Sequence, residues 1–110
     1  MERILSLLGF AKKAGKLVTG SNAVLRSILY GEAYIVIVTK DAGNSVKDKF
    51  NRLCSENDVK FFVFGDEESF ERATGEKNKV IYSVTEAGFS NKLVQLIEGL
   101  EKNNGGAVIG

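Results

Sequence analysis

The stretch Lys16-Leu17-Val18-Thr19-Gly20-Ser21-Asn22-Ala23-Val24-Leu25-Arg26 decides how this chain folds. It predicts a short strand, a glycine turn and the start of an amphipathic helix. Gly20 can adopt backbone angles closed to other residues, so a partner can come close to the main chain there. Ser21 is a favourable N-cap, and the helix after it leaves unpaired N–H groups at its positive end. Such a helix start can bind an anion.

Three side chains add to this anion site. Asn22 and Arg26 are four residues apart and share one face of the expected helix, and Lys16 precedes the turn. Together they suit a phosphate backbone and base edges. The same junction occurs throughout α/β proteins, where exposed Asn and Arg are ordinary, so the local residues leave a solvated helix start open as the alternative. On the opposite face we expect four inward residues, Val24, Leu25, Ile28 and Leu29.

Composition excludes several classes of protein. The chain has 110 residues, 44% of them hydrophobic and 26% charged, which is typical of one globular domain. Its net charge is +1, so affinity for nucleic acid would have to come from local clusters of basic residues. The chain has no histidine, and its one cysteine, Cys54, falls on the apolar face of an expected helix. We therefore expect no enzyme, no metal site and no cofactor.

The sequence shows neither a membrane-spanning segment nor a secretion signal. No apolar run approaches the roughly 18 residues of a membrane span, and no signal-peptide pattern is present. We therefore expect a cytoplasmic protein without a membrane partner. We also expect a single domain over residues 1–102, followed by a flexible tail over 103–110 that contains two adjacent glycines.

Helices and short strands alternate along the chain. The run Ile35-Val36-Ile37-Val38 is apolar on both faces, as a strand in the middle of a covered sheet would be. This alternation predicts an α/β protein with a three-layer α/β/α sandwich around about four strands. The expected helices span 2–14, 21–30, 45–57, the segment between Asp66 and Gly75, and 87–102, and the expected strands span 17–19, 34–39, 60–64 and 80–84.

Two charged clusters have competing explanations. Lys12, Lys13 and Lys16 surround the end of the first helix, where they either complement the helix dipole or face phosphate. The run Asp66-Glu67-Glu68 is acidic enough to suggest a metal site, but acids at the start of a helix are explained by the helix dipole, and we expect no metal there. With Glu71, Glu67 and Glu68 make this end of the molecule unfavourable for phosphates.

Four motifs occur in order within about Ile4 to Leu100. They are Leu8-Gly9-Phe10-Ala11-Lys12-Lys13-Ala14-Gly15-Lys16-Leu17 with the turn Gly20-Ser21-Asn22, then Thr39-Lys40-Asp41-Ala42, then Ala73-Thr74-Gly75 followed by a charged loop and Val80-Ile81-Tyr82-Ser83-Val84-Thr85, and Val84-Thr85-Glu86-Ala87-Gly88-Phe89. In this order they resemble the kink-turn RNA-binding family of ribosomal proteins seven-Ae and thirty-e. The last of them is most similar to the small bacterial YlxQ-type group of ribosomal proteins.

The resemblance implies a mixed four-stranded sheet and a site at the start of the second helix and in the loop before the last strand. In that site Gly20 and Ser21 approach the RNA backbone, and Asn22 contacts a purine edge. Arg26 contacts a base or phosphate, and Lys16 leads into the turn. Lys77 and Lys79 in the loop would hold phosphates. Ala23 departs from the family pattern, which has Glu there, and the loop 76–79 is more charged than its counterpart in the family.

These observations support two classes of function. The first is a non-catalytic, monomeric binder of structured RNA, a kink-turn or ribosomal RNA, in a ribosomal or ribonucleoprotein context that includes ribosomal proteins. The second is a protein–protein adaptor with the same fold, which would use the apolar and acidic segment Phe64 to Glu71.

Overall fold

The computed structural model describes residues 1–103, with the backbone alone at 102 and 103. Helices and strands alternate, as expected. Their bounds are α1 (Glu2–Lys13), β1 (Leu17–Thr19), α2 (Ser21–Leu29), β2 (Ile35–Val38), α3 (Asn44–Glu56), β3 (Lys60–Val63), α4 (Glu67–Thr74), β4 (Ile81–Val84) and α5 (Ala87–Asn103). The tail expected over 103–110 lies outside the described residues except for Asn103, which ends α5. The domain boundary at 102 stays a prediction.

The four strands form one mixed sheet in the order β1-β4-β2-β3. β4 lies antiparallel to both β1 and β2, so Val84 is opposite Leu17 on one side and Ile35 on the other. β2 and β3 run parallel. The two central strands, β2 and β4, are buried along their whole length, as the apolar run in β2 indicates.

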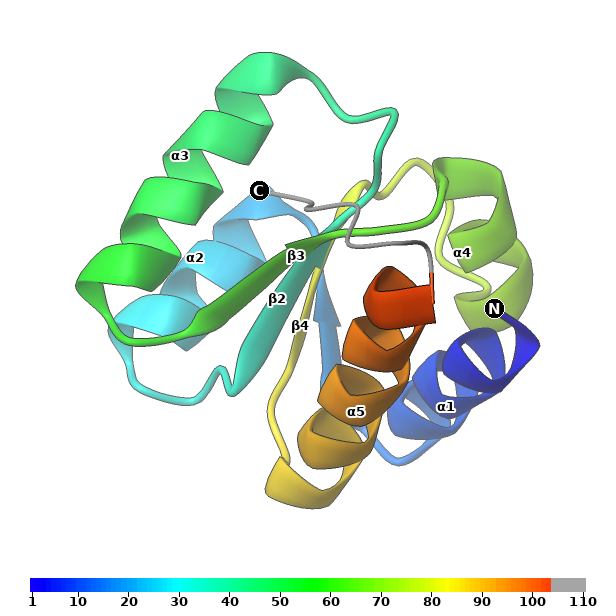
Figure 1. Cartoon of the computed structure of the whole chain (residues 1–110). Helices are drawn as coiled ribbons and strands as arrows, with labels where there is room; N and C mark the ends of the chain where they lie inside the picture. Colours follow the sequence, from blue (N-terminus) through cyan, green and yellow to red (C-terminus); the bar gives the residue numbers. More distant parts are fainter. Residues whose placement is uncertain (104–110) are drawn as a thin grey trace.

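Helices cover both faces of the sheet, which confirms the three-layer α/β/α fold. α1, α4 and α5 lie on one face, and α2 and α3 on the other (Figure 1). Successive β2 residues alternate between two cores: Ile35 and Ile37 join the first, and Val36 and Val38 the second. At the centre of the first core the rings of Phe70 and Tyr82 lie 5.0 Å apart, centroid to centroid.

The inward face of α2 differs from the expected one at its last turn. Leu29 is 56% exposed, so its assignment to the core was wrong. Ser27 is buried in its place and its hydroxyl lies 2.8 Å from that of Ser83 on β4. The spacing Val24, Ser27, Ile28 follows the helical period, whereas Leu29 points roughly 100° away from Ile28.

Two carboxylates accept hydrogen bonds from backbone N–H groups at the starts of helices. Asp66 accepts a hydrogen bond of 2.7 Å from the backbone N–H of Ser69 at the start of α4, and Glu86 accepts one of 2.7 Å from Phe89 in α5. These backbone bonds favour the ionised form and lower the pKa of both groups. A carboxylate with a lowered pKa stabilises the fold above its unfolded pKa and loses that contribution as the pH falls through the folded value.

Glu86→Gln is therefore expected to lower the free energy of unfolding at pH 7 more than at acid pH. The difference from the wild type should begin to shrink below about pH 4.5, the ordinary pKa of glutamate, because the unfolded chain then takes up a proton at Glu86. It should disappear as the pH falls through the lowered pKa of Glu86 in the folded protein. Urea denaturation at a series of pH values measures this difference. Glu32→Gln, at an exposed carboxylate between α2 and β2, is the control. A difference that stays constant between pH 7 and pH 3 would contradict the capping role.

Candidate nucleic-acid interface

Gly20 joins the end of β1 to the start of α2 in a conformation that glycine alone accommodates readily, with φ 91° and ψ 154°. Its N–H donates a 3.0 Å hydrogen bond to the carbonyl of Ile81, and its carbonyl accepts one of 3.0 Å from Val24. Gly20 is thus the N-cap of α2, and the assignment of Ser21 as N-cap was wrong. Within the described residues no side chain caps this helix, so its first amides are free of side-chain competitors.

The loop between α4 and β4 comes to this turn. The Nζ of Lys79 lies 3.3 Å from the position that a Gly20 Cβ would occupy, so the lysine side chain packs directly over Gly20. The hydroxyl of buried Tyr82 donates a 3.0 Å hydrogen bond to the carbonyl of Lys79 and holds that end of the loop. Lys77 is exposed two residues earlier. The structure therefore brings Lys79 of this loop and the Gly20 turn together, with Lys77 exposed in the same loop.

Asn22 and Arg26 are both exposed on α2. Their spacing of four residues places them on one face of the helix. Arg26 takes part in none of the ion pairs formed among residues 1–101. Its guanidinium is therefore available to an external anion, as is the carboxamide of Asn22.

Lys16 is placed differently from the other predicted residues. It precedes β1, at the opposite end of that strand from Gly20, where its carbonyl accepts a 2.9 Å hydrogen bond from the N–H of Thr85. Its positive charge contributes to the lowered pKa of Glu86. The structure therefore does not bring Lys16 to Lys79.

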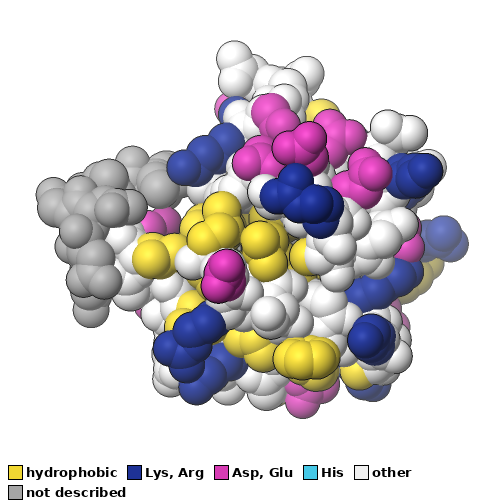
Figure 2. Space-filling model, turned by 90° about the vertical axis from the view of Figure 1, so that its right-hand side faces the viewer, with side chains coloured by type: hydrophobic (Ala, Val, Ile, Leu, Met, Phe, Trp, Pro, Cys, Tyr) yellow, Lys and Arg dark blue, Asp and Glu magenta, His cyan; other side chains and the backbone are white. Residues whose placement is uncertain are grey.

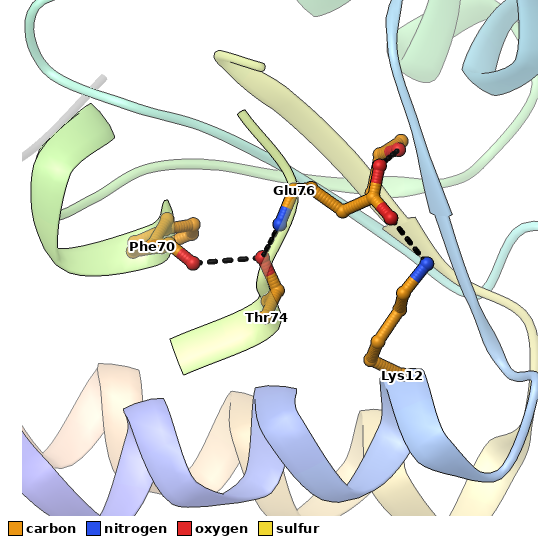
Figure 3. Close-up of polar contacts among 5 residues, drawn as sticks. Lys12, Phe70, Thr74 and Glu76 are labelled. Carbon is orange, nitrogen blue, oxygen red and sulfur yellow. Dashed lines mark hydrogen bonds and ion pairs between the residues drawn. The ribbon is translucent and has the colours of Figure 1, made fainter. Parts of the chain in front are cut away.

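Lys12, on the last turn of α1, reaches the loop instead. Its ammonium is bonded to one carboxylate oxygen of Glu76, and the other oxygen accepts a 3.1 Å hydrogen bond from the hydroxyl of Thr19. Figure 3 shows the Glu76 side chain extended from the loop toward Lys12. The bonds from Lys12 and Thr19, with the charges of Lys12 and Lys79, lower the pKa of Glu76. Sequence reasoning noted Lys12 in a lysine cluster but missed Thr19 and Glu76 as parts of the site.

The segment expected for an adaptor offers little apolar surface. Phe64 is 8% exposed and Phe70 is fully buried, because both belong to the core under α4. Figure 2 shows acidic side chains above a small apolar patch, with Lys and Arg side chains around it. A shallow groove between α1 and α4, lined by Leu5, Phe10 and Ala73 among others, contributes to this face.

Other kinds of site use a reactive thiol or a metal-ligand cluster, and the described residues bear on both. Cys54 is buried, and burial raises the pKa of its thiol to about 12, so it is not a nucleophile at neutral pH. Residues 1–101 contain no group of three or more His, Cys, Asp or Glu side chains that could hold a metal. None of the described helices is long and apolar enough to cross a membrane.

The chain matches the model of the Ribosomal protein L7Ae/L30e/S12e/Gadd45 family over residues 2–94. It belongs to this family. Two relatives named RNA-binding protein YlxQ are similar to it over most of their length. The one from Bacillus subtilis (strain 168) is 32% identical over 92 residues, which cover 84% of this chain and 92% of the relative. The one from Enterococcus faecium is 33% identical over 98 residues, which cover 89% and 94%.

Solved structures share the fold of this L7Ae/L30e/S12e/Gadd45 member. A Bacillus halodurans protein described as having unknown function is 36% identical, with a TM-score of 0.85 over 89% of this chain and 99% of its own. The Giardia lamblia 15.5kD RNA binding protein has a TM-score of 0.75 over 87% and 85% of the two chains. At 20% identity the Giardia protein shows the fold alone.

Proposed function

We propose that this member of the L7Ae/L30e/S12e/Gadd45 family is a non-catalytic binder of structured RNA, with a kink-turn as its target. The site consists of the α2 start from Gly20 to Arg26 and the loop 75–79. The observation that carries the proposal is the approach of Lys79 to Gly20, which joins two segments far apart in the sequence into one basic edge. The printed names of the two YlxQ relatives support RNA as the ligand.

The physical basis is a division of roles within this edge. Free amides at the start of α2, together with Lys77, Lys79 and Arg26, supply positive charge for a bent phosphate backbone. Asn22 can donate to and accept from a base edge, which is the kind of contact that carries sequence information. Gly20 and Ser21 let the RNA backbone come close. Lys16 belongs to this site only if the RNA extends along β1 to its other end.

The cellular setting that we propose is a ribosomal or other ribonucleoprotein particle in the cytoplasm, in which the protein acts as a monomer beside ribosomal proteins. Ala23 takes the place of the family's glutamate in the first turn of α2. A carboxylate there would add a base contact, so we expect this chain to depend more on phosphate contacts and RNA shape than on base recognition.

Arg26→Ala is expected to weaken binding to a kink-turn RNA by more than about 1 kcal/mol, the size of one charge-assisted contact. It should also reduce the slope of log K against log salt by about 0.7 to 0.9, because one phosphate contact is lost. Stability should hardly change, because Arg26 is exposed. Fluorescence anisotropy over a salt series measures both quantities.

Arg52→Ala on α3 is the matched control, since it removes an exposed arginine from a helix on the same face of the sheet. Equal losses of RNA affinity in the two variants would mean that affinity depends only on the net charge of the protein. Unchanged affinity in Arg26→Ala at moderate salt would remove Arg26 from the site.

A further inference from the structure

Glu76 is an acidic residue among the basic residues of the proposed RNA-binding surface. A carboxylate that faces phosphates repels them, so its presence beside Lys12 and Lys79 needs a compensating reason. Its contacts supply one. The side chain is only 25% exposed, and both of its oxygens are bonded, to Lys12 on α1 and to Thr19 on β1.

The backbone of Glu76 is fixed as well. Its N–H donates a 3.2 Å hydrogen bond to the hydroxyl of Thr74, which itself donates one of 2.8 Å to the carbonyl of Phe70 (Figure 3). Between them Gly75 ends α4 in the left-handed conformation, with φ 78°. The residue therefore connects three elements, α1, β1 and the end of α4, at the point where the loop begins.

The far end of the loop has an anchor of its own. Tyr82 holds the carbonyl of Lys79 from within the core, and Asn78 takes the left-handed conformation, with φ 59°, to make the turn. Lys77 and Asn78 between the anchors are exposed. With both ends fixed, the loop has little freedom to move Lys79 away from Gly20.

We propose that Glu76 is a positioning residue of the RNA-binding surface: by tying the loop 75–79 to Lys12 and Thr19 it holds Lys79 across Gly20. This inference rests on the proposed function. The opposing account is that Glu76 occupies the place of a phosphate among Lys12, Thr19 and Lys79, and that RNA must displace it. The two explanations predict opposite changes in RNA affinity when Glu76 is replaced.

The test is the affinity of Glu76→Ala and Glu76→Gln for a kink-turn RNA at one salt concentration. Positioning predicts that Glu76→Ala binds about fivefold more weakly, even though a negative charge has been removed, because the free loop must be ordered on binding. Glu76→Gln keeps an oxygen acceptor for Thr19 and should fall between the wild type and Glu76→Ala. Binding by Glu76→Ala as tight as that of the wild type, or tighter, would overturn the inference in favour of competition with phosphate.

Two further variants isolate the cause. In a Lys79→Ala background, Glu76→Ala should add little further loss, because its effect acts through Lys79; full additivity would overturn the inference. Glu68→Ala removes a carboxylate whose side chain is 85% exposed on α4, outside the loop, and should leave binding unchanged or slightly tighter.

Amide hydrogen exchange of residues 76–79 in the free protein separates this inference from the proposed function. Faster exchange in Glu76→Ala, with no loss of protection in β2, supports the anchoring role, and unchanged exchange overturns it. If the wild type binds neither kink-turn nor duplex RNA, the proposed function fails, while the exchange measurement still decides whether Glu76 anchors the loop.

Discussion

Replacing Gly20 with alanine is expected to lower the free energy of unfolding by about 1 to 3 kcal/mol and to weaken RNA binding about tenfold. The first effect follows from the backbone angles of Gly20, φ 91° and ψ 154°, which an L residue adopts only under strain. The second follows from the new methyl group, which would fill the space that lets the RNA backbone come close to Gly20 and would lie 3.3 Å from the Nζ of Lys79, so that this ammonium must shift by a few tenths of an ångström. Urea denaturation and RNA titration measure the two effects separately.

Gly31→Ala is the matched control at the other end of α2. Gly31 also has a positive φ, 73°, but a Cβ there would meet no heavy atom within 4 Å. We expect this variant to lose stability of about 1 kcal/mol through backbone strain and to keep its affinity for RNA. If both variants lost RNA affinity equally, the loss would come from general destabilisation, and the direct contact between Gly20 and Lys79 would not matter for binding.

Phe70→Ala is expected to have the largest effect on stability, about 3 to 5 kcal/mol. The ring is fully buried and packs against Tyr82. It also fills the space beside Gly65, where a Cβ would lie only 2.5 Å from the nearest ring atom. A loss of this size is a large part of the about 5 to 15 kcal/mol that stabilises a typical domain. The midpoint of urea denaturation should fall while its slope stays similar.

Phe10→Ala tests whether the loss of stability in Phe70→Ala depends on the burial of the ring. Phe10 is 56% exposed on α1, so its removal should cost less than about 1 kcal/mol. Similar losses from Phe10→Ala and Phe70→Ala would contradict the assignment of Phe70 to the centre of the first core.

Local patterns in the sequence were sufficient to predict the fold. The β-branched run Ile35–Val38 indicates a strand with two buried faces, and the structure places it in the middle of the sheet. Glycines and cap residues mark the helix ends to within one or two positions. The error at Leu29 arose because the apolar pattern does not show that a polar residue, Ser27, is buried against Ser83 through a hydroxyl pair.

The candidate site was predicted less completely, because its parts come together only in the folded chain. The turn at Gly20 has a local signature, so it could be found. The bond from Lys12 to Glu76 joins residues 64 positions apart, and no periodicity or motif connects them. Lys16 is next to the turn in sequence, yet an extended strand of three residues carries Gly20 away from it.

The edge formed by the Gly20 turn and the loop 75–79 is the surface that we propose binds bent RNA. Its most direct test is the affinity of the wild-type protein for a kink-turn RNA and for a straight duplex of equal length, titrated at the same salt concentration. Phosphate contacts alone would bind both RNAs, whereas a surface shaped for a bend distinguishes them. We predict that the kink-turn binds about tenfold more tightly or better, and that Arg26→Ala removes much of this preference. Equal affinity for the two RNAs would contradict the claim.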